Sequence, residues 1–298
     1  MRRTLPLALL LALGACATAP AAEAPPAPAP AAPAAAAEAE VPATMQWLYG
    51  SGEGGAASIQ AWHGFRDYVL EAARSRPASS VVLAEGSTLT AARFVPCGDK
   101  PPAVILDADE TVIQNLGFEY ALARRGKDYD RDLHRKWMAE GVKELAPMPG
   151  AVTALDAVRA AGVKVLFNTN RDGEFAANAE EALNAAGLGP AVHLDTLFLR
   201  GDPPGDREKD GRRALLAERY CVLAMAGDQL GDFSDLFNAR GLAVAERRRA
   251  ATTLPFARLW GNGWFLLSNP VYGPGLRGGF DDVFPAGTRW ADPQGGQD

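Results

Sequence analysis

The chain has 298 residues, of which 30 are Lys or Arg and 36 are Asp or Glu, so its formal net charge is −6. This balance argues against a protein that wraps a nucleic acid polymer, because neutralising phosphates requires a basic surface. Hydrophobic residues make up 48% and charged residues 22%, which is ordinary globular composition. The three cysteines are too few for a disulfide-rich scaffold.

Residues 1–16 have the order of a secretory signal: two arginines, an apolar run over residues 5–13, and small residues before Cys16. This run is too short to cross a hydrocarbon core of ~30 Å. The small residues before Cys16, with Leu13 three places upstream, resemble the cleavage box of bacterial lipoproteins. That resemblance implies that Cys16 is the lipidated first residue of the mature chain. A plain signal peptide with an incidental cysteine is the alternative.

Residues 17–44 contain 15 Ala and 7 Pro in 28 positions. Proline at this density prevents a continuous helix and favours an extended tether, which would hold a folded domain away from the membrane. The absence of Asp directly after Cys16 resembles lipoproteins sent to the outer membrane of a Gram-negative cell. We therefore expect a lipid anchor in that membrane, with the domain in the periplasm or at the cell surface.

The remaining residues, 45–298, are predicted to form one folded domain in which strands alternate with helices. Apolar residues at steps of three and four predict a helix over residues 57–75, and a short apolar run predicts a buried strand over 103–106. The same signals predict, in chain order, a helix at 152–158, a strand at 163–167, a helix at 174–186, a strand at 196–199, a helix at 211–219, and strands at 221–226 and 242–245. This alternation indicates an α/β fold with a doubly wound, mostly parallel sheet. Polar, helix-prone residues around 112–148 interrupt it and predict a helical cap insertion.

Paired aspartates follow two of the predicted strands. Asp107 and Asp109 come after the strand at 103–106, and Asp228 and Asp232 come after the strand at 221–226. Ligands of doubly wound sheets bind beyond the carboxyl ends of the strands, so we expect these side chains to share one pocket. Without a cation, four carboxylates would repel one another. Mg²⁺ takes oxygen ligands and accepts substrate phosphate as a further ligand, so the pattern predicts a magnesium site.

Groups that suit an anion are predicted at the same pocket. Thr169 and Asn170 follow the strand at 163–167 and offer a hydroxyl and backbone N–H groups. Lys209 precedes the helix at 211–219 and offers a positive charge near a helix N-terminus. Carboxylates, a cation, a hydroxyl and a lysine are the parts that phosphoryl transfer needs, because its barrier falls through positioning and charge neutralisation.

Structural roles are the alternative for each of these residues. Asp and Thr are common in surface turns, Asp228 and Asp232 could cap a helix, Thr169 could be an N-cap, and Lys209 lies in a charged run. A catalytically silent binding or adhesion lipoprotein on the same fold is therefore a second hypothesis. Dehalogenation or phosphomutase chemistry is a third.

The motifs, taken in order, resemble the haloacid dehalogenase (HAD) superfamily of phosphatases. They are DADET at 107–111, Thr169 after a strand, Lys209 before a helix, and GDQLGD at 227–232. The stretches PPAVILDADETV, NTNR, KDGRR and GNGWFLLSNPVYG resemble, more narrowly, the class C nonspecific acid phosphatases, which are bacterial surface lipoproteins. The resemblance covers roughly residues 45–285 and is more specific than any single motif.

This resemblance implies a role for each acid. Asp107 would attack phosphorus and form an aspartyl-phosphate, and Asp109 would protonate the leaving alcohol and then deprotonate water. Asp228 would bind Mg²⁺ beside the Asp107 carboxylate and the Asp109 backbone carbonyl, and Asp232 would steady the metal. A nucleophile must be ionised and an acid must start protonated, so we expect the environment to separate the pKa values of Asp107 and Asp109 in that direction.

The resemblance also implies a substrate. Small phosphomonoesters, nucleoside 5′-monophosphates among them, would be held at the phosphoryl oxygens by Thr169, Asn170 and Lys209. Four aromatic residues are candidates for stacking on a nucleobase or, alternatively, for packing the cap: Phe118, Tyr120, Trp137 and Tyr272. Gln114 stands where the family often has Asp, and we expect it at the pocket entrance.

Cys97 and Cys221 lie just upstream of strands predicted to be neighbours. They could form a disulfide in an oxidising periplasm or remain two buried thiols. The expected partners are a small phosphomonoester and, through Cys16, a membrane, whereas a nucleic acid polymer is not expected. The sequence leaves a homodimer open.

Overall fold

The computed structural model describes residues 40–127, 129–205 and 208–290, which lie in one compact unit, Ala39–Asp298. The predicted signal, the lipidation site Cys16 and most of the predicted tether lie outside the described residues. A short helix, α1 (Ala43–Met45), begins just before the end of the predicted tether, and a π-helical turn at Gln46–Gly50 follows it. In the described part of the chain, no helix is both long enough and apolar enough to span a membrane.

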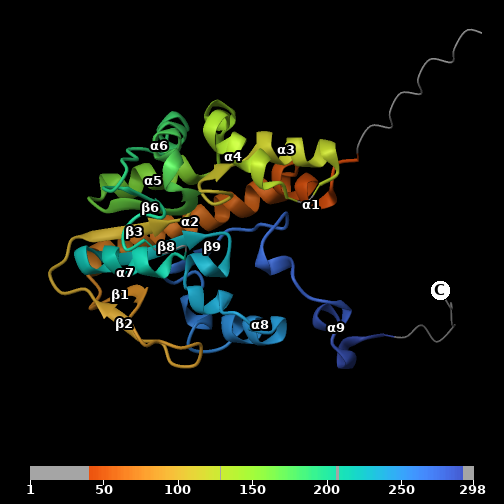
Figure 1. The fold of residues 1–298 in the computed structure, drawn as a ribbon. Helices are drawn as coiled ribbons and strands as arrows, with labels where there is room; N and C mark the ends of the chain where they lie inside the picture. The colour runs from red at the N-terminus through yellow and green to blue at the C-terminus, as the bar shows by residue number, and fades with distance from the viewer. Residues whose placement is uncertain (1–39, 128, 206–207, 291–298) are drawn as a thin grey trace, which may run out of the picture. The chain divides into compact units, whose positions relative to one another are not determined.

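A five-stranded sheet forms the centre of the fold (Figure 1), with all neighbouring pairs parallel and the order β7-β6-β3-β8-β9. The strands are β3 (Pro102–Leu106), β6 (Lys164–Asp172), β7 (Leu197–Arg200), β8 (Cys221–Gly227) and β9 (Trp264–Leu266). From β3 the chain first adds strands on one side and then continues with β8 on the other. The sheet is doubly wound, as predicted, and its topological switch point lies between β3 and β8.

Helices cover both faces of the sheet, because successive residues of each strand point to opposite sides. Val104 and Leu106 of β3 pack into one apolar cluster, whereas Ala103 and Ile105 pack into the other. The first cluster includes residues of α2 (Gly52–Ser75), α5 (Ala151–Ala160) and α6 (Ala176–Ala185). The second includes residues of α7 (Asp210–Arg219), α8 (Val244–Thr252) and the antiparallel pair β1 (Ser79–Leu83) and β2 (Phe94–Pro96).

The long helix α2 shows how the sequence sets these contacts. Trp62, Phe65 and Val69 recur at helical spacing and are buried against the sheet. The helix begins five residues before the predicted start, where the Ser51 hydroxyl accepts a hydrogen bond from the Gly54 N–H at 2.9 Å. Apolar spacing locates the buried face of a helix, whereas the cap locates its first turn.

The interval around 112–148 is helical. It contains α3 (Leu116–Arg125) and α4 (Arg131–Glu140), which lie between the two short strands β4 (Ile113–Gln114) and β5 (Ala146–Pro147). These strands pair antiparallel, so the helical segment leaves and rejoins the domain at one place. A last short helix, α9 (Phe280–Val283), lies near the end of the described chain (Figure 1).

The predicted strand at 242–245 is wrong. Val244 begins α8, and the fifth strand of the sheet is β9, which the sequence analysis does not predict. A four-residue apolar run does not distinguish a strand from the first turn of a helix, because it is too short to show a period. The other predicted elements are confirmed, with ends that differ by a few residues.

Cys97 and Cys221 form a disulfide, so the alternative of two free thiols is excluded. The bond joins the residue after β2 to the first residue of β8 across 124 positions of the chain. It therefore ties the β1–β2 pair to the central sheet.

We predict that replacing both cysteines (Cys97→Ala with Cys221→Ala) lowers the free energy of unfolding by about 2–4 kcal/mol, because the unfolded chain is no longer closed into a long loop. Urea unfolding followed by circular dichroism measures the change. Dithiothreitol should destabilise the wild type and leave the double variant unaffected. Equal stability of the two proteins would contradict the prediction.

Candidate active site

Three carboxylates converge at the carboxyl ends of β3 and β8. Leu106 pairs with Ala226 in the sheet, and the Asp107 N–H donates to the Ala226 carbonyl at 2.9 Å, so the residues that follow both strands emerge at the same edge. The side chains of Asp107, Asp228 and Asp232 are all buried there, with carboxylate oxygens within 4.8 Å of one another. The predicted convergence of acids from two strands is therefore present.

Lys209 and Thr111 bridge these acids. The buried Lys209 ammonium donates to Asp107 and, at 2.7 Å, to Asp232. Burial lowers the pKa of Lys209, but the negative charges of Asp107 and Asp232 outweigh it and raise the pKa above its ordinary value. The Thr111 hydroxyl lies 3.2 Å from Asp107 Oδ2 and 3.4 Å from Asp228 Oδ1. Lys209 is thus an internal cation at the acidic cluster.

One lysine does not balance three buried acids. Burial raises the pKa of Asp107 to about 7, with Lys209 opposing the shift and Asp232 and Asp109 adding to it. Burial, together with the charges of Asp232 and Asp107, also raises the pKa of Asp228 well above its ordinary range. A divalent cation would relieve this repulsion, and an all-oxygen donor set suits a hard ion. The residues present therefore fit a divalent metal.

Asp109 lies in a different electrostatic environment. Its carboxylate accepts from Arg171 Nη2 at 2.7 Å and from Asn115 Nδ2 at 2.8 Å. Burial raises the pKa of Asp109, but the charge and hydrogen bonds of Arg171 outweigh it and lower the pKa to about 2. The expected direction of the pKa difference between Asp107 and Asp109 is therefore reversed in this structure, because Asp107 faces other acids while Asp109 faces a guanidinium.

Arg171 was not assigned a role from the sequence, although a local signal exists. Strand β6 continues to Asp172, beyond the predicted end at residue 167. Thr169 and Arg171 are two positions apart on this strand and both are buried, so they share a face. The Thr169 hydroxyl lies 3.5 Å from Asp109 Oδ2. Asn170, the residue between Thr169 and Arg171, points to the opposite face of the strand, and its Oδ1 accepts from Arg212 at 3.1 Å.

A cavity of about 820 Å³ opens above these groups. Asp107, Asp109, Asn170, Lys209, Asp228 and Asp232 all line it. Thr169 lies behind Asp109 and is not among the described lining residues. Most of the residues predicted to act on phosphate and metal therefore face one space.

The four candidate aromatic residues divide into two groups. Phe118 lines the cavity and packs edge-on against His134, and Tyr272 also lines it and donates its hydroxyl to Glu110. Tyr120 is 67% exposed and lies outside the lining, so its prediction as a pocket residue is wrong. Tyr120 lies on the solvent side of α3, two positions after Phe118.

Trp137 does not line the cavity either. Its indole Nε1 donates to Asn115 Oδ1 at 2.9 Å, while Asn115 in turn donates to Asp109. Trp137 therefore supports the residue that holds Asp109, which sequence reasoning missed because the two positions are 22 residues apart.

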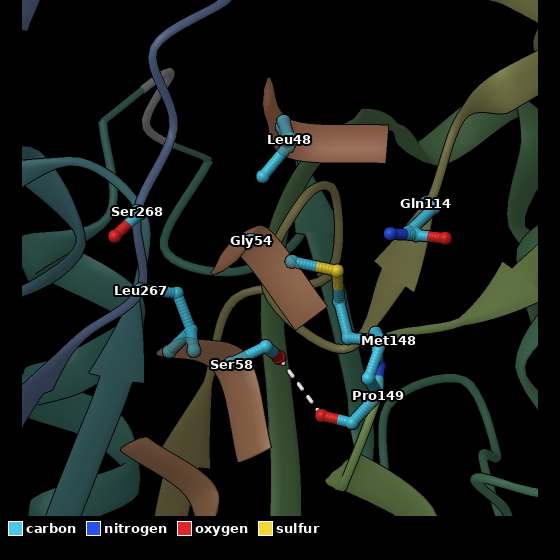
Figure 2. Close-up of a pocket in the computed structure, with 8 residues that line it drawn as sticks. All are labelled: Leu48, Gly54, Ser58, Gln114, Met148, Pro149, Leu267 and Ser268. Carbon is cyan, nitrogen blue, oxygen red and sulfur yellow. Dashed lines mark hydrogen bonds between the residues drawn. The ribbon is translucent and has the colours of Figure 1, made fainter. Parts of the chain in front are cut away.

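Gln114 does not lie at the entrance, contrary to expectation. It lines a separate cavity of about 10 Å³ together with Met148 and Ser58, and is absent from the described lining of the large cavity. Ser58 lines the same small cavity, and its hydroxyl donates to the Pro149 carbonyl at 2.8 Å (Figure 2). A space of this size holds about one water molecule, so Gln114 belongs to the packing between α2 and the β4–β5 pair.

Two buried glutamates were also missed. Glu110 has φ +53°, a conformation that is uncommon for residues other than glycine, and is fully buried. It accepts from the Asn115 N–H at 2.8 Å, from the Tyr49 hydroxyl at 3.1 Å and from Tyr272. Glu119 of α3 is 4% exposed and lines the cavity. Glu110 belongs to the DADET run, whereas no sequence pattern marks Glu119.

Comparisons with known proteins agree with this geometry. The sequence profile of the family described as "HAD superfamily, subfamily IIIB (Acid phosphatase)" matches residues 60–275. Among solved structures, two of the class C acid phosphatase from Bacillus anthracis are similar to this chain, one of them with tungstate bound. Each has a TM-score of 0.61 and 24% sequence identity, and the match covers 77% of this chain and 84% of that chain. A comparison with curated protein sequences found no match. The structural similarity supports the fold, and the profile match shows the family.

We predict that Glu119→Gln raises the melting temperature at pH 8 but hardly changes it at pH 4. Burial and the charge of Glu110 raise the pKa of Glu119 to about 8 in the folded protein, above its ordinary value of 4.5. At pH 4 the wild-type carboxyl is therefore neutral in the folded state. As the pH rises from 4.5 to 8, it ionises more readily in the unfolded chain than in the folded protein, so the free energy of unfolding falls.

Thermal unfolding at several pH values measures this difference. Glu140→Gln, an exposed position on α4, is the matched control and should show no such trend. A pH-independent effect of Glu119→Gln would contradict the assigned environment.

Proposed function

Because this chain belongs to the acid phosphatases of HAD subfamily IIIB, and is therefore a phosphomonoesterase, we propose that it hydrolyses small phosphomonoesters with Mg²⁺ through an aspartyl-phosphate on Asp107. The observation that carries the proposal is the convergence of Asp107, Asp228 and Asp232 at one edge of the sheet, with Lys209 between them. When bound, Mg²⁺ would supply positive charge that neutralises these carboxylates and the phosphoryl oxygens.

The chemical steps follow from the chain's own residues. The Asp107 carboxylate oxygen forms a bond to phosphorus as the bond from phosphorus to the leaving oxygen breaks. To act as the acid, Asp109 must first take up a proton, which requires that Arg171 is drawn from it, and the phosphoryl group that enters offers Arg171 another negative partner. The protonated Asp109 then gives its proton to the leaving oxygen, and later takes one from the water that attacks the aspartyl-phosphate and releases phosphate. Lys209 and Asn170, which line the cavity, hold the phosphoryl oxygens, and Thr169 joins them once Asp109, which lies in front of it, shifts. Asp228, with Asp232, would hold the metal beside Asp107.

Nucleoside 5′-monophosphates are among the proposed substrates. A cavity of about 820 Å³ is within the range of small-molecule sites. Phe118 and Tyr272 both line it and offer aromatic surface to a base.

We further propose that lipidated Cys16 anchors the protein in the outer membrane, with the enzyme in the periplasm or at the cell surface. The basis is the charged, apolar and small-residue order of residues 1–16, which precedes a proline-rich stretch. The Cys97–Cys221 disulfide supports an oxidising compartment outside the cytoplasm.

We predict that the purified protein hydrolyses p-nitrophenyl phosphate in mildly acidic buffer, that EDTA abolishes turnover, and that Mg²⁺ restores it. Asp107→Asn should lower kcat by roughly three orders of magnitude or more, because an amide cannot act as the nucleophile. Asp228→Asn should lose the rise in melting temperature that Mg²⁺ gives the wild type. Turnover that survives Asp107→Asn would exclude Asp107 as the nucleophile. Turnover that EDTA does not change would exclude a required metal ion.

We predict that full-length protein made in a Gram-negative host sediments with membranes and incorporates labelled palmitate, whereas Cys16→Ala does neither. Acyl chains contribute ~0.8 kcal/mol per buried methylene, so losing them releases the protein. Phosphatase activity in each fraction tracks the enzyme. An unlabelled wild type found in the soluble fraction would favour the plain signal peptide.

A further inference from the structure

Glu119 is a buried carboxyl that faces the catalytic cavity without a partner. Its side chain is 4% exposed and lines the cavity, yet it makes no hydrogen bond or ion pair with any residue that the structure describes. A buried polar group is normally satisfied, and a buried charge is normally paired. Because Glu119 borders the cavity, its missing partner can be a ligand group that enters there.

The neighbouring Glu110 makes the contrast plain. Glu110 is equally buried but accepts from Asn115, Tyr49 and Tyr272. Glu110 is therefore satisfied by the protein, whereas Glu119 remains available to a ligand. The two glutamates have different roles: one holds the loop after β3, and the other faces the space.

The charges around Glu119 favour a cation. Burial, and then the charge of Glu110, raise the pKa of Glu119 to about 8, and no positive group among the described residues offsets the cost of ionising it. Cationic residues that line the cavity are already paired: Lys209 with Asp107 and Asp232, Arg171 with Asp109, Arg200 with Asp172, and Lys127 with Asp130. A protonated amine would supply both the charge and the hydrogen-bond donors that Glu119 lacks.

The position of Glu119 relates it to the leaving group. Asn115 hydrogen bonds to Asp109, the proposed proton donor to the leaving oxygen, and Glu119 lies one helical turn further along α3. A group that binds Glu119 while phosphorus lies at Asp107 therefore extends from the leaving oxygen along α3. We propose that Glu119 binds a protonated amine of the leaving group, so that phosphomonoesters of amino alcohols are favoured substrates; this inference rests on the proposed function.

The test compares ω-aminoalkyl phosphates with n-alkyl phosphates of equal chain length, from two to six carbons, at pH 7 with Mg²⁺. For the wild type, we expect kcat/KM to favour the amine about tenfold or more at the chain length that reaches Glu119. Glu119→Gln should reduce this ratio to about one, because the amide cannot ionise when the ammonium group binds. Glu140→Gln, the exposed control in the same insertion, should keep the wild-type ratio.

Binding provides a readout that does not need turnover. Calorimetry with the matched aminoalkyl and alkyl phosphonates should show the same preference in Kd, and Glu119→Gln should lose it. Two results overturn the inference: equal kcat/KM for both series at every chain length, or a preference for the amine that Glu119→Gln retains. If alkyl phosphates are still hydrolysed in either case, the proposed function stands. If neither series is hydrolysed, the proposed function fails and the inference falls with it.

Discussion

Repulsion among buried carboxylates at the carboxyl ends of β3 and β8 is the constraint on which the site depends. The two strands are neighbours at the switch point of the sheet, so Asp107 and Asp228 cannot separate without breaking the strand pairing. Burial removes the water that would screen them. Only positive charge can stabilise carboxylates held in this way. This requirement explains why Lys209 is buried among them and why their oxygens form a donor set that fits a divalent ion.

Two buried cations divide the site between them. Lys209 contacts Asp107 and Asp232, whereas Arg171 contacts Asp109. Burial and the neighbouring acids raise the pKa of Asp107 despite Lys209, whereas Arg171 outweighs burial and lowers the pKa of Asp109, although the two residues are two positions apart. A phosphoryl group also carries negative charge, so an entering substrate competes with the aspartates for both cations.

The helical insertion connects the reacting groups with the far end of the cavity. Asn115, the N-cap of α3, and Trp137 of α4 form a chain of hydrogen bonds that ends on Asp109, while Phe118 and Glu119 of α3 line the space beyond it. The helical insertion thus sets the orientation of the acid and part of the wall that the leaving group meets. Changes in this insertion can alter substrate preference without altering the sheet that holds Asp107.

The sequence by itself determined the alternating α/β order, the doubly wound sheet and the acids after β3 and β8, because buried strands and the acids that follow them are local patterns. Only the tertiary structure decided that the fifth strand is β9 rather than residues 242–245, and that Cys97 is bonded to Cys221. It likewise decided that Arg171 neutralises Asp109 and that Tyr120 faces solvent while Glu119 is buried. Pairing, burial and charge balance arise between residues distant in the chain, so no local pattern carries them.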